Sequence, residues 1–168
     1  KKKKVTEVQT FSVPFPLREN QGNLTINTNS PSKPSKEELI NQAFKFHSQG
    51  NNLEAAKYYQ YFIDRGFKEH RVFSNYGSIL KNLGKLKQAD LYTRKAIALN
   101  PNIYKSHYLL GTILIGQKKL QEAEEALQKA IDLKPDLFQA HVDLGSVLKD
   151  LGKLKEAQIS TLKAINLK

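Results

Sequence analysis

The chain has 168 residues, enough for one modest domain, and it contains no cysteine, which excludes disulfides and thiolate-bound metal. Hydrophobic residues make up 39% of it, but no apolar run reaches the roughly 18 residues needed to span a bilayer. The net charge of +11 would attract an acidic partner, although the lysines are dispersed, as on a solvated helical surface. The lack of cysteine is compatible with the cytoplasm, where we expect the protein.

The first 35 residues differ in composition from the rest of the chain. They contain four of the six prolines, and no helical period is visible in them. The stretch Val5–Val13 could be extended, and Asn20–Pro34 has the composition of a linker. We therefore predict an extended or disordered N-terminal segment over residues 1–35. Its apolar side chains could instead pack along the rest of the chain or pair with a second chain; they are Phe11, Val13, Phe15 and Leu17.

A period of 34 residues follows this segment. It is carried by Gly77, Gly111 and Gly145, and three further sets of residues keep the same interval. These sets are Ala89, Ala123 and Ala157; Ala96, Ala130 and Ala164; and Pro101 and Pro135. A fixed period of this length indicates stacked repeats that bury their apolar faces against one another. We predict four units, each a helix, a tight turn and a second helix, over residues 36–69, 70–103, 104–137 and 138–168.

Glycines recur in the turns between the two helices of a unit, at Gly50, Gly84 and Gly152. A left-handed residue after a helix favours glycine, because glycine has no Cβ to clash. The third unit has Lys118 at this place and Gly116 two residues earlier. We therefore expect its turn to be energetically less favourable than the others, or slightly shifted along the chain.

The periodic small residues predict close contacts between helices. Gly77 falls where the two helices of its unit approach each other, and Ala89 faces it. A larger side chain at either place would push the helices apart, at a cost of about 1–3 kcal/mol. Pro101 and Pro135 predict the ends of second helices, because the residue before a proline avoids the α-helical conformation.

Together these positions resemble the tetratricopeptide repeat. Asn75-Tyr76-Gly77, Leu109-Leu110-Gly111 and Asp143-Leu144-Gly145, each followed twelve residues later by alanine, are similar to its signature. Stretches such as Gly84-Lys85-Leu86-Lys87-Gln88-Ala89 are similar to bacterial, especially cyanobacterial, members. The resemblance implies an all-α fold: a right-handed superhelical stack, or α-solenoid, of about four helix-turn-helix units over residues 36–168, preceded by the extended N-terminal segment.

The first and last units depart from the pattern in different ways. Ala43 and Phe67 replace the glycine and the proline in the first unit, as suits a terminal unit that caps the stack. The last unit ends at Lys168 with no polar helix to cover it. We therefore expect either a longer natural protein or self-association, through this uncapped helix or through the N-terminal segment.

Candidate catalytic and metal-binding groups are weak. Gly111 to Lys118 has the spacing of a phosphate-binding loop, but it lies in a helix-turn-helix and lacks the following serine or threonine. His107 and His141 occupy equivalent places in successive units, roughly 10 Å apart by helix packing. Two histidines that share a zinc must each lie about 2 Å from it, so buried packing residues are the better interpretation. We expect no enzymatic activity, no cofactor and no metal.

Binding by the first helices is the stronger hypothesis. In tetratricopeptide repeat proteins the first helices line the concave side of the array, so the resemblance implies a groove for an extended peptide of a protein partner. Amides could bind the peptide backbone, cations its acidic groups, and an apolar floor its side chains. The predicted groove residues are Ile40, Asn41, Phe44, Arg71, Asn75, Lys81, Lys105, Tyr108, Thr112, Gln139 and Lys149.

Two binding devices of the family match only in part. Asn75 and Lys105 fit a clamp for the terminal carboxylates of a chaperone, but the remaining positions of that clamp are apolar here. Asn41 and Asn75 fit an asparagine ladder, which Leu109 and Asp143 interrupt.

The leading prediction is a non-enzymatic scaffold for protein–protein interaction. A targeting or regulatory arm truncated from a longer transferase is the alternative. Binding of RNA by the helical repeats is a further alternative, although the positions for stacking bases are sparse and we do not expect a nucleic-acid partner.

Overall fold

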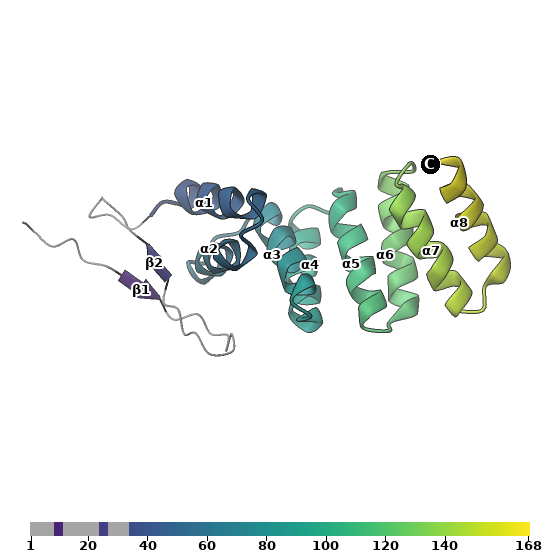
Figure 1. The fold of residues 1–168 in the computed structure, drawn as a ribbon, viewed down its shortest axis with the longest axis horizontal. Helices are drawn as coiled ribbons and strands as arrows, with labels where there is room; N and C mark the ends of the chain where they lie inside the picture. Colours follow the sequence, from purple (N-terminus) through teal and green to yellow (C-terminus); the bar gives the residue numbers. More distant parts are fainter. Residues whose placement is uncertain (1–8, 12–23, 27–33) are drawn as a thin grey trace, which may run out of the picture. The chain divides into compact units, whose positions relative to one another are not determined.

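A computed structural model of the chain describes residues 9–11, 24–26 and 34–168 (Figure 1). These residues form eight helices and two three-residue strands. The structure divides into two compact units, Lys1–Phe67 (unit 1) and Lys68–Lys168 (unit 2), and each is described by itself. Of the apolar residues predicted to pack or pair at the N-terminus, Val13, Phe15 and Leu17 lie outside the described residues.

Unit 1 contains a short two-stranded sheet. Strand β1 (Gln9–Phe11) pairs antiparallel with β2 (Leu24–Ile26), so that Thr10 lies opposite Thr25. Strand β1 falls within the stretch predicted to be extended. Strand β2, in contrast, falls within the predicted linker Asn20–Pro34 and gives three of its residues a regular structure.

The helices of unit 1 are α1 (Lys36–Ser48) and α2 (Asn52–Asp64). A capping box starts α1: the Ser35 side chain accepts a hydrogen bond from the Glu38 amide at 3.2 Å, and the Glu38 carboxylate accepts one from the Ser35 amide at 2.7 Å. The backbone hydrogen bond from Ser35 is the main cause that lowers the pKa of the Glu38 carboxyl group. The helix therefore starts at a defined residue.

Aromatic side chains fill the space between α1 and α2. Tyr59 and Phe62 are fully buried, and the Tyr59 ring meets the edge of Phe44 at a centroid distance of 6.1 Å. Phe67 packs on Phe62 with their ring centroids 5.2 Å apart. In this unit an aromatic residue therefore closes the helix pair at the place where later repeats have proline.

Unit 2 is built from three helix pairs. The helices are α3 (His70–Asn82), α4 (Leu86–Leu99), α5 (Tyr104–Gly116), α6 (Leu120–Leu133), α7 (Phe138–Asp150) and α8 (Leu154–Asn166). Each helix packs against the next one along the chain, and the first helices of successive pairs also contact each other, α3 with α5 and α5 with α7. The predicted all-α repeat fold is confirmed. Strands occur only before residue 35 in the part of the chain that the structure describes.

The glycines with the 34-residue period lie at close contacts between paired helices. A Cβ on Gly77 would lie 2.5 Å from Oγ1 of Thr93, and one on Gly111 would lie 2.7 Å from Cδ2 of Leu127. These distances are too short for real side chains, so the predicted close approach is confirmed. The main obstacle at Gly77 is Thr93, however, whereas the predicted neighbour Ala89 contributes its backbone oxygen at 3.3 Å.

The turn of the third pair has its left-handed residue at the same place as the other turns. Lys118 adopts a φ of 60°, whereas Gly50, Gly84 and Gly152 have φ values of 74°, 72° and 77°. The amide of Lys118 donates to the carbonyl of Ile115 at 2.9 Å, as the amide of Gly84 does to Lys81. The expectation of a shifted turn is therefore wrong. The expectation of a less favourable turn is confirmed, because a residue with a Cβ occupies the left-handed region.

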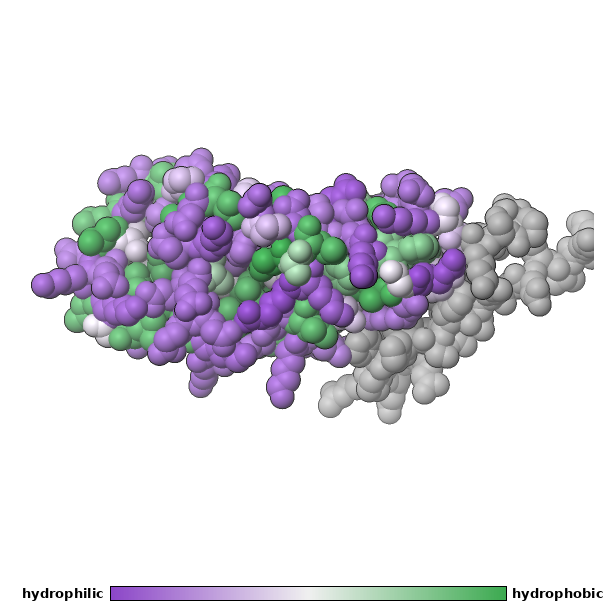
Figure 2. Space-filling view, turned by 180° about the vertical axis from the view of Figure 1, so that it is seen from behind, coloured by the Kyte–Doolittle hydropathy of each residue, from purple (hydrophilic) through white to green (hydrophobic). Residues whose placement is uncertain are grey.

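Figure 2 shows one face of the molecule, on which hydrophilic surface dominates and hydrophobic areas lie between the charged side chains. No helix in the described part of the chain is both long and apolar enough to cross a membrane.

Candidate peptide-binding surface

The first helices of unit 2 bring most of the predicted groove residues onto neighbouring elements. Because α3 contacts α5 and α5 contacts α7, the predicted residues lie on three neighbouring helices, and we call this set of side chains the first-helix surface. Its members are Arg71, Asn75 and Lys81 on α3; Lys105, Tyr108 and Thr112 on α5; and Gln139, Asp143 and Lys149 on α7.

Cations dominate the charge of the first-helix surface. Lys105 and Lys149 are exposed and Lys81 is half-buried. No ion pair joins these three lysines to another side chain within the described residues. Arg71 differs from them, because its Nε lies 2.9 Å from a carboxylate oxygen of Glu69. The surface therefore offers three ammonium groups to an anionic ligand.

Tyr108 and Asp143 connect α5 to α7 on this surface. Burial, followed by the charge of Asp143 and a hydrogen bond to its carboxylate, raises the pKa of the Tyr108 hydroxyl to about 12. The hydroxyl is therefore a proton donor at neutral pH and is held by Asp143. This contact occupies the carboxylate of Asp143, and the Tyr108 side chain is half-buried against the hydrophobic core.

Small polar groups complete the surface. Asn75 is half-buried and already engaged by a neighbour. Ser74 and Ser106 approach each other from α3 and α5, with their hydroxyl oxygens 3.4 Å apart. The hydroxyl of Thr112 donates to the carbonyl of Leu109 at 2.9 Å within α5, so Thr112 is turned toward its own helix.

The remaining predicted residues lie on α1 of unit 1. Ile40 is buried, Phe44 is half-buried against Tyr59, and Asn41 is exposed. Phe44 therefore contributes to the packing of its own unit.

The histidines of α5 and α7 hold the loops that precede these helices. Nε2 of His107 lies 2.8 Å from the carbonyl oxygen of Pro101, and Nε2 of His141 lies 2.9 Å from that of Pro135. A carbonyl can only accept, so each Nε2 carries the proton. Among the described residues there is no group of three or more histidine and acidic side chains that could hold a metal.

The sequence did not indicate the Tyr108–Asp143 contact, because the two residues are a whole repeat apart. Sequence reasoning also missed the capping box of Ser35 and Glu38, although the serine followed three residues later by glutamate is a recognisable signal.

Models of the tetratricopeptide repeat match residues 70–103, 104–137 and 138–168, which is more than half of the chain. The chain therefore belongs to the tetratricopeptide repeat family. The matched segments have the same bounds as the second, third and fourth predicted units.

Similar solved structures share this fold. The solved chain of MamA 41-end from Desulfovibrio magneticus RS-1 matches with a TM-score of 0.73 at 23% identity, over 79% of this chain and 75% of that chain. YrrB, described as a TPR protein with an unusual peptide-binding site, matches with a TM-score of 0.73 at 19% identity, over 80% of this chain and 69% of the YrrB chain. The first TPR of Spaghetti (RPAP3), bound to the HSP90 peptide SRMEEVD, matches with a TM-score of 0.65 at 25% identity, over 70% and 93%.

A comparison with curated proteins gave no match. The fold of this chain is that of a TPR protein-interaction scaffold.

Proposed function

We propose that the first-helix surface of unit 2 binds an extended, acidic peptide segment of a partner protein, without catalysis. The observation that carries the proposal is the set of three lysines, Lys81, Lys105 and Lys149, which have no acidic partner of their own. Two structures with this fold, YrrB and the RPAP3 domain, are described as having a peptide-binding site or a bound peptide, which supports a peptide as the ligand.

The chemistry of the surface favours acidic over neutral peptides. An ammonium group forms charge-assisted hydrogen bonds with a carboxylate, which are about twice as strong as neutral ones. The ring of Tyr108 and the half-buried Ile115 on the same helix add apolar contact between the cations. A partner segment with carboxylates on either side of an apolar residue would use both features.

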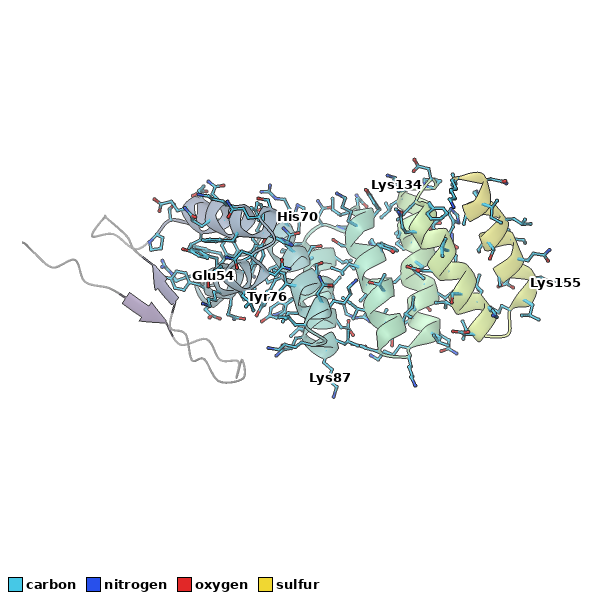
Figure 3. All side chains as sticks on the ribbon, viewed as in Figure 1. Glu54, His70, Tyr76, Lys87, Lys134 and Lys155 are labelled. Carbon is cyan, nitrogen blue, oxygen red and sulfur yellow. The ribbon has the colours of Figure 1, made fainter. Side chains whose placement is uncertain are left out.

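The test compares two charge-reversal variants of equal net charge. Lys105→Glu with Lys149→Glu changes the first-helix surface. Lys87→Glu with Lys129→Glu is the matched control, because both of its lysines are exposed on second helices, α4 and α6, and Lys87 extends away from α4 in Figure 3. Binding is measured by fluorescence polarisation on an array of seven-residue peptides of graded charge.

We expect acidic peptides to bind the wild type and the control alike, and to lose at least about tenfold in affinity with K105E/K149E. Equal losses in the two variants, or no preference for acidic peptides, would contradict the proposal.

Replacing Asn75, Lys105 and Tyr108 together should also abolish binding while circular dichroism shows the fold intact. RNA of the same length, titrated in a salt series, tests the nucleic-acid alternative, because phosphate contacts weaken steeply with salt.

Whether Ile40, Asn41 and Phe44 of unit 1 contribute to binding stays a prediction. Single alanine variants at Asn41 and Phe44, measured on the same peptides, would decide it.

A further inference from the structure

Helix α8 exposes an apolar side. Leu154, Ile159, Leu162 and Ile165 are 65%, 66%, 53% and 64% exposed. With 3.6 residues per turn, Leu154, Leu162 and Ile165 lie along one side of the helix and Ile159 lies beside Leu162. Hydrophobic surface is visible at the end of unit 2 that α8 forms, on the left of Figure 2.

Two of these residues, Leu154 and Ile165, occupy positions that in α6 lie at the interface with α7. One repeat earlier, Ile131 occupies the place of Ile165 and Leu120 that of Leu154. Ile131 is only 7% exposed and Leu120 is half-buried, because α7 packs against α6. A further helix pair after α8 would cover Ile165 and Leu154 in the same way.

The other two residues have no such counterpart. Glu125 and Gln128 occupy the places of Ile159 and Leu162 in α6, and both are exposed although α7 packs against that helix. A further helix pair would therefore leave Ile159 and Leu162 in water. Two large apolar side chains at positions that stacking does not bury indicate a different partner for this side of α8.

We propose that this partner is the α8 helix of a second copy of the chain, packed antiparallel about a two-fold axis near Ile159 and Ser160. A two-fold interface presents the same surface from both copies, so each contact occurs twice. In this register Leu154 of one copy lies opposite Ile165 of the other, and Leu162 lies close to the axis.

The charges of α8 fit an antiparallel pair. Glu156 and Lys163 are exposed, seven residues apart and on the same edge of the apolar side. The antiparallel register places Glu156 beside Lys163 of the second copy, so that opposite charges meet along this edge. Lys153, a cation of the same chain near Glu156, is already bound to Glu124 at 2.7 Å.

The ends of the helices also agree with this orientation. Lys155, in the first turn of α8, would lie near the last turn of the second α8, where the free carbonyl groups favour a cation. Its long side chain can bury its methylene groups while the ammonium group stays in water. A single helix pair is a small interface, so we expect a weak, reversible dimer.

The first test measures mass by sedimentation velocity over a concentration series of the whole chain. The variant Ile159→Glu with Leu162→Gln carries the residues that α6 has at the same places, so it should fold. Leu91→Glu is the control, because Leu91 is 52% exposed at the equivalent place of Ile159 in α4. Circular dichroism confirms that all three proteins are helical.

We expect the average mass of the wild type and of L91E to rise from 19.1 kDa toward twice that value, and that of I159E/L162Q to stay at one chain. A wild type that stays monomeric, or a double variant that associates like the wild type, overturns the proposal. Growth beyond two copies overturns the two-fold arrangement.

The second test addresses the register. Glu156→Lys should weaken association about tenfold through repulsion from Lys163 of the second copy. Adding Lys163→Glu should restore it, because the opposite charges then meet again. No effect of E156K, or no rescue by K163E, would show that α8 is not paired antiparallel.

Discussion

Lys118 shows how a single residue can keep a turn that its chemistry disfavours. It has a φ of 60° at a place where the turns of the other helix pairs have glycine. A left-handed residue with a Cβ costs about 1–2 kcal/mol, yet the Lys118 amide keeps the hydrogen bond to the carbonyl three residues earlier that the Gly84 amide makes. The packing of α5 against α6 on either side of the turn therefore sets the conformation.

We expect Lys118→Gly to raise the free energy of unfolding by about 1 kcal/mol, because glycine adopts this conformation without the clash. Chemical denaturation followed by circular dichroism measures the change. The reverse substitution, Gly84→Lys, is the control: nothing lies within 4 Å of a Cβ built there, and its φ is 72°. It should lower stability by a similar amount. A stabilising G84K, or a neutral K118G, would show that the left-handed conformation carries no cost here.

The residues that sequence reasoning placed correctly share a physical property. Gly77 is required by a close contact between two helices, and Pro101 follows the end of α4, which it prevents from continuing. Both constraints are local, and both residues recur with the 34-residue period, so the sequence indicates them. The contact between Tyr108 and Asp143 is a tertiary one. Its existence depends on how far α5 and α7 are shifted along each other, which no local pattern encodes.

At the scale of elements, the difference between prediction and structure lies in the strands. All helices fall inside the predicted units, because their apolar period repeats over many residues. Strand β2 pairs with β1 across a separation of more than ten residues. A strand of three residues is too short to show an alternating hydrophobic pattern among the surrounding Asn, Ser and Thr residues. Composition alone therefore assigned this stretch to a linker.

The contact between α1 and α2 contains a group that responds to pH. Nδ1 of His47 lies 3.1 Å from the hydroxyl of Tyr59, and burial lowers the pKa of His47. The His47 side chain of the unfolded chain thus binds a proton more readily than that of the folded chain. The stabilisation that neutral His47 contributes is therefore full above the ordinary histidine pKa of 6.5. It is lost as the pH falls through the lower pKa of His47 in the folded chain.

We expect the stability of the wild type to fall more steeply than that of His47→Gln as the pH is lowered from about 7 to 5. Denaturation midpoints of the two proteins across this range measure the difference, and the comparison removes the effect of the other histidines. Parallel curves would mean that His47 is protonated equally in the folded and unfolded states.

At the scale of the whole molecule, the division after Phe67 separates one helix pair from three. A repeat cannot bury its apolar side alone, and about three repeats are needed for a stable stack. Unit 2 meets this condition: a continuous cluster that includes Leu114, Leu127 and Leu144 runs through its last two pairs. Tyr76 and Tyr92, whose ring centroids are 4.9 Å apart, fill its first pair.

We therefore expect Lys68–Lys168, produced alone, to fold with the helix content of unit 2 and to unfold cooperatively, because its three helix pairs pack against one another. Circular dichroism with thermal denaturation measures both properties. Residues 34–67 alone are the control and should be largely unfolded, since one helix pair buries too little surface to offset its conformational entropy. If residues 68–168 were unfolded on their own, the first helix pair would be needed for the stack, and the division would not mark an independent folding unit.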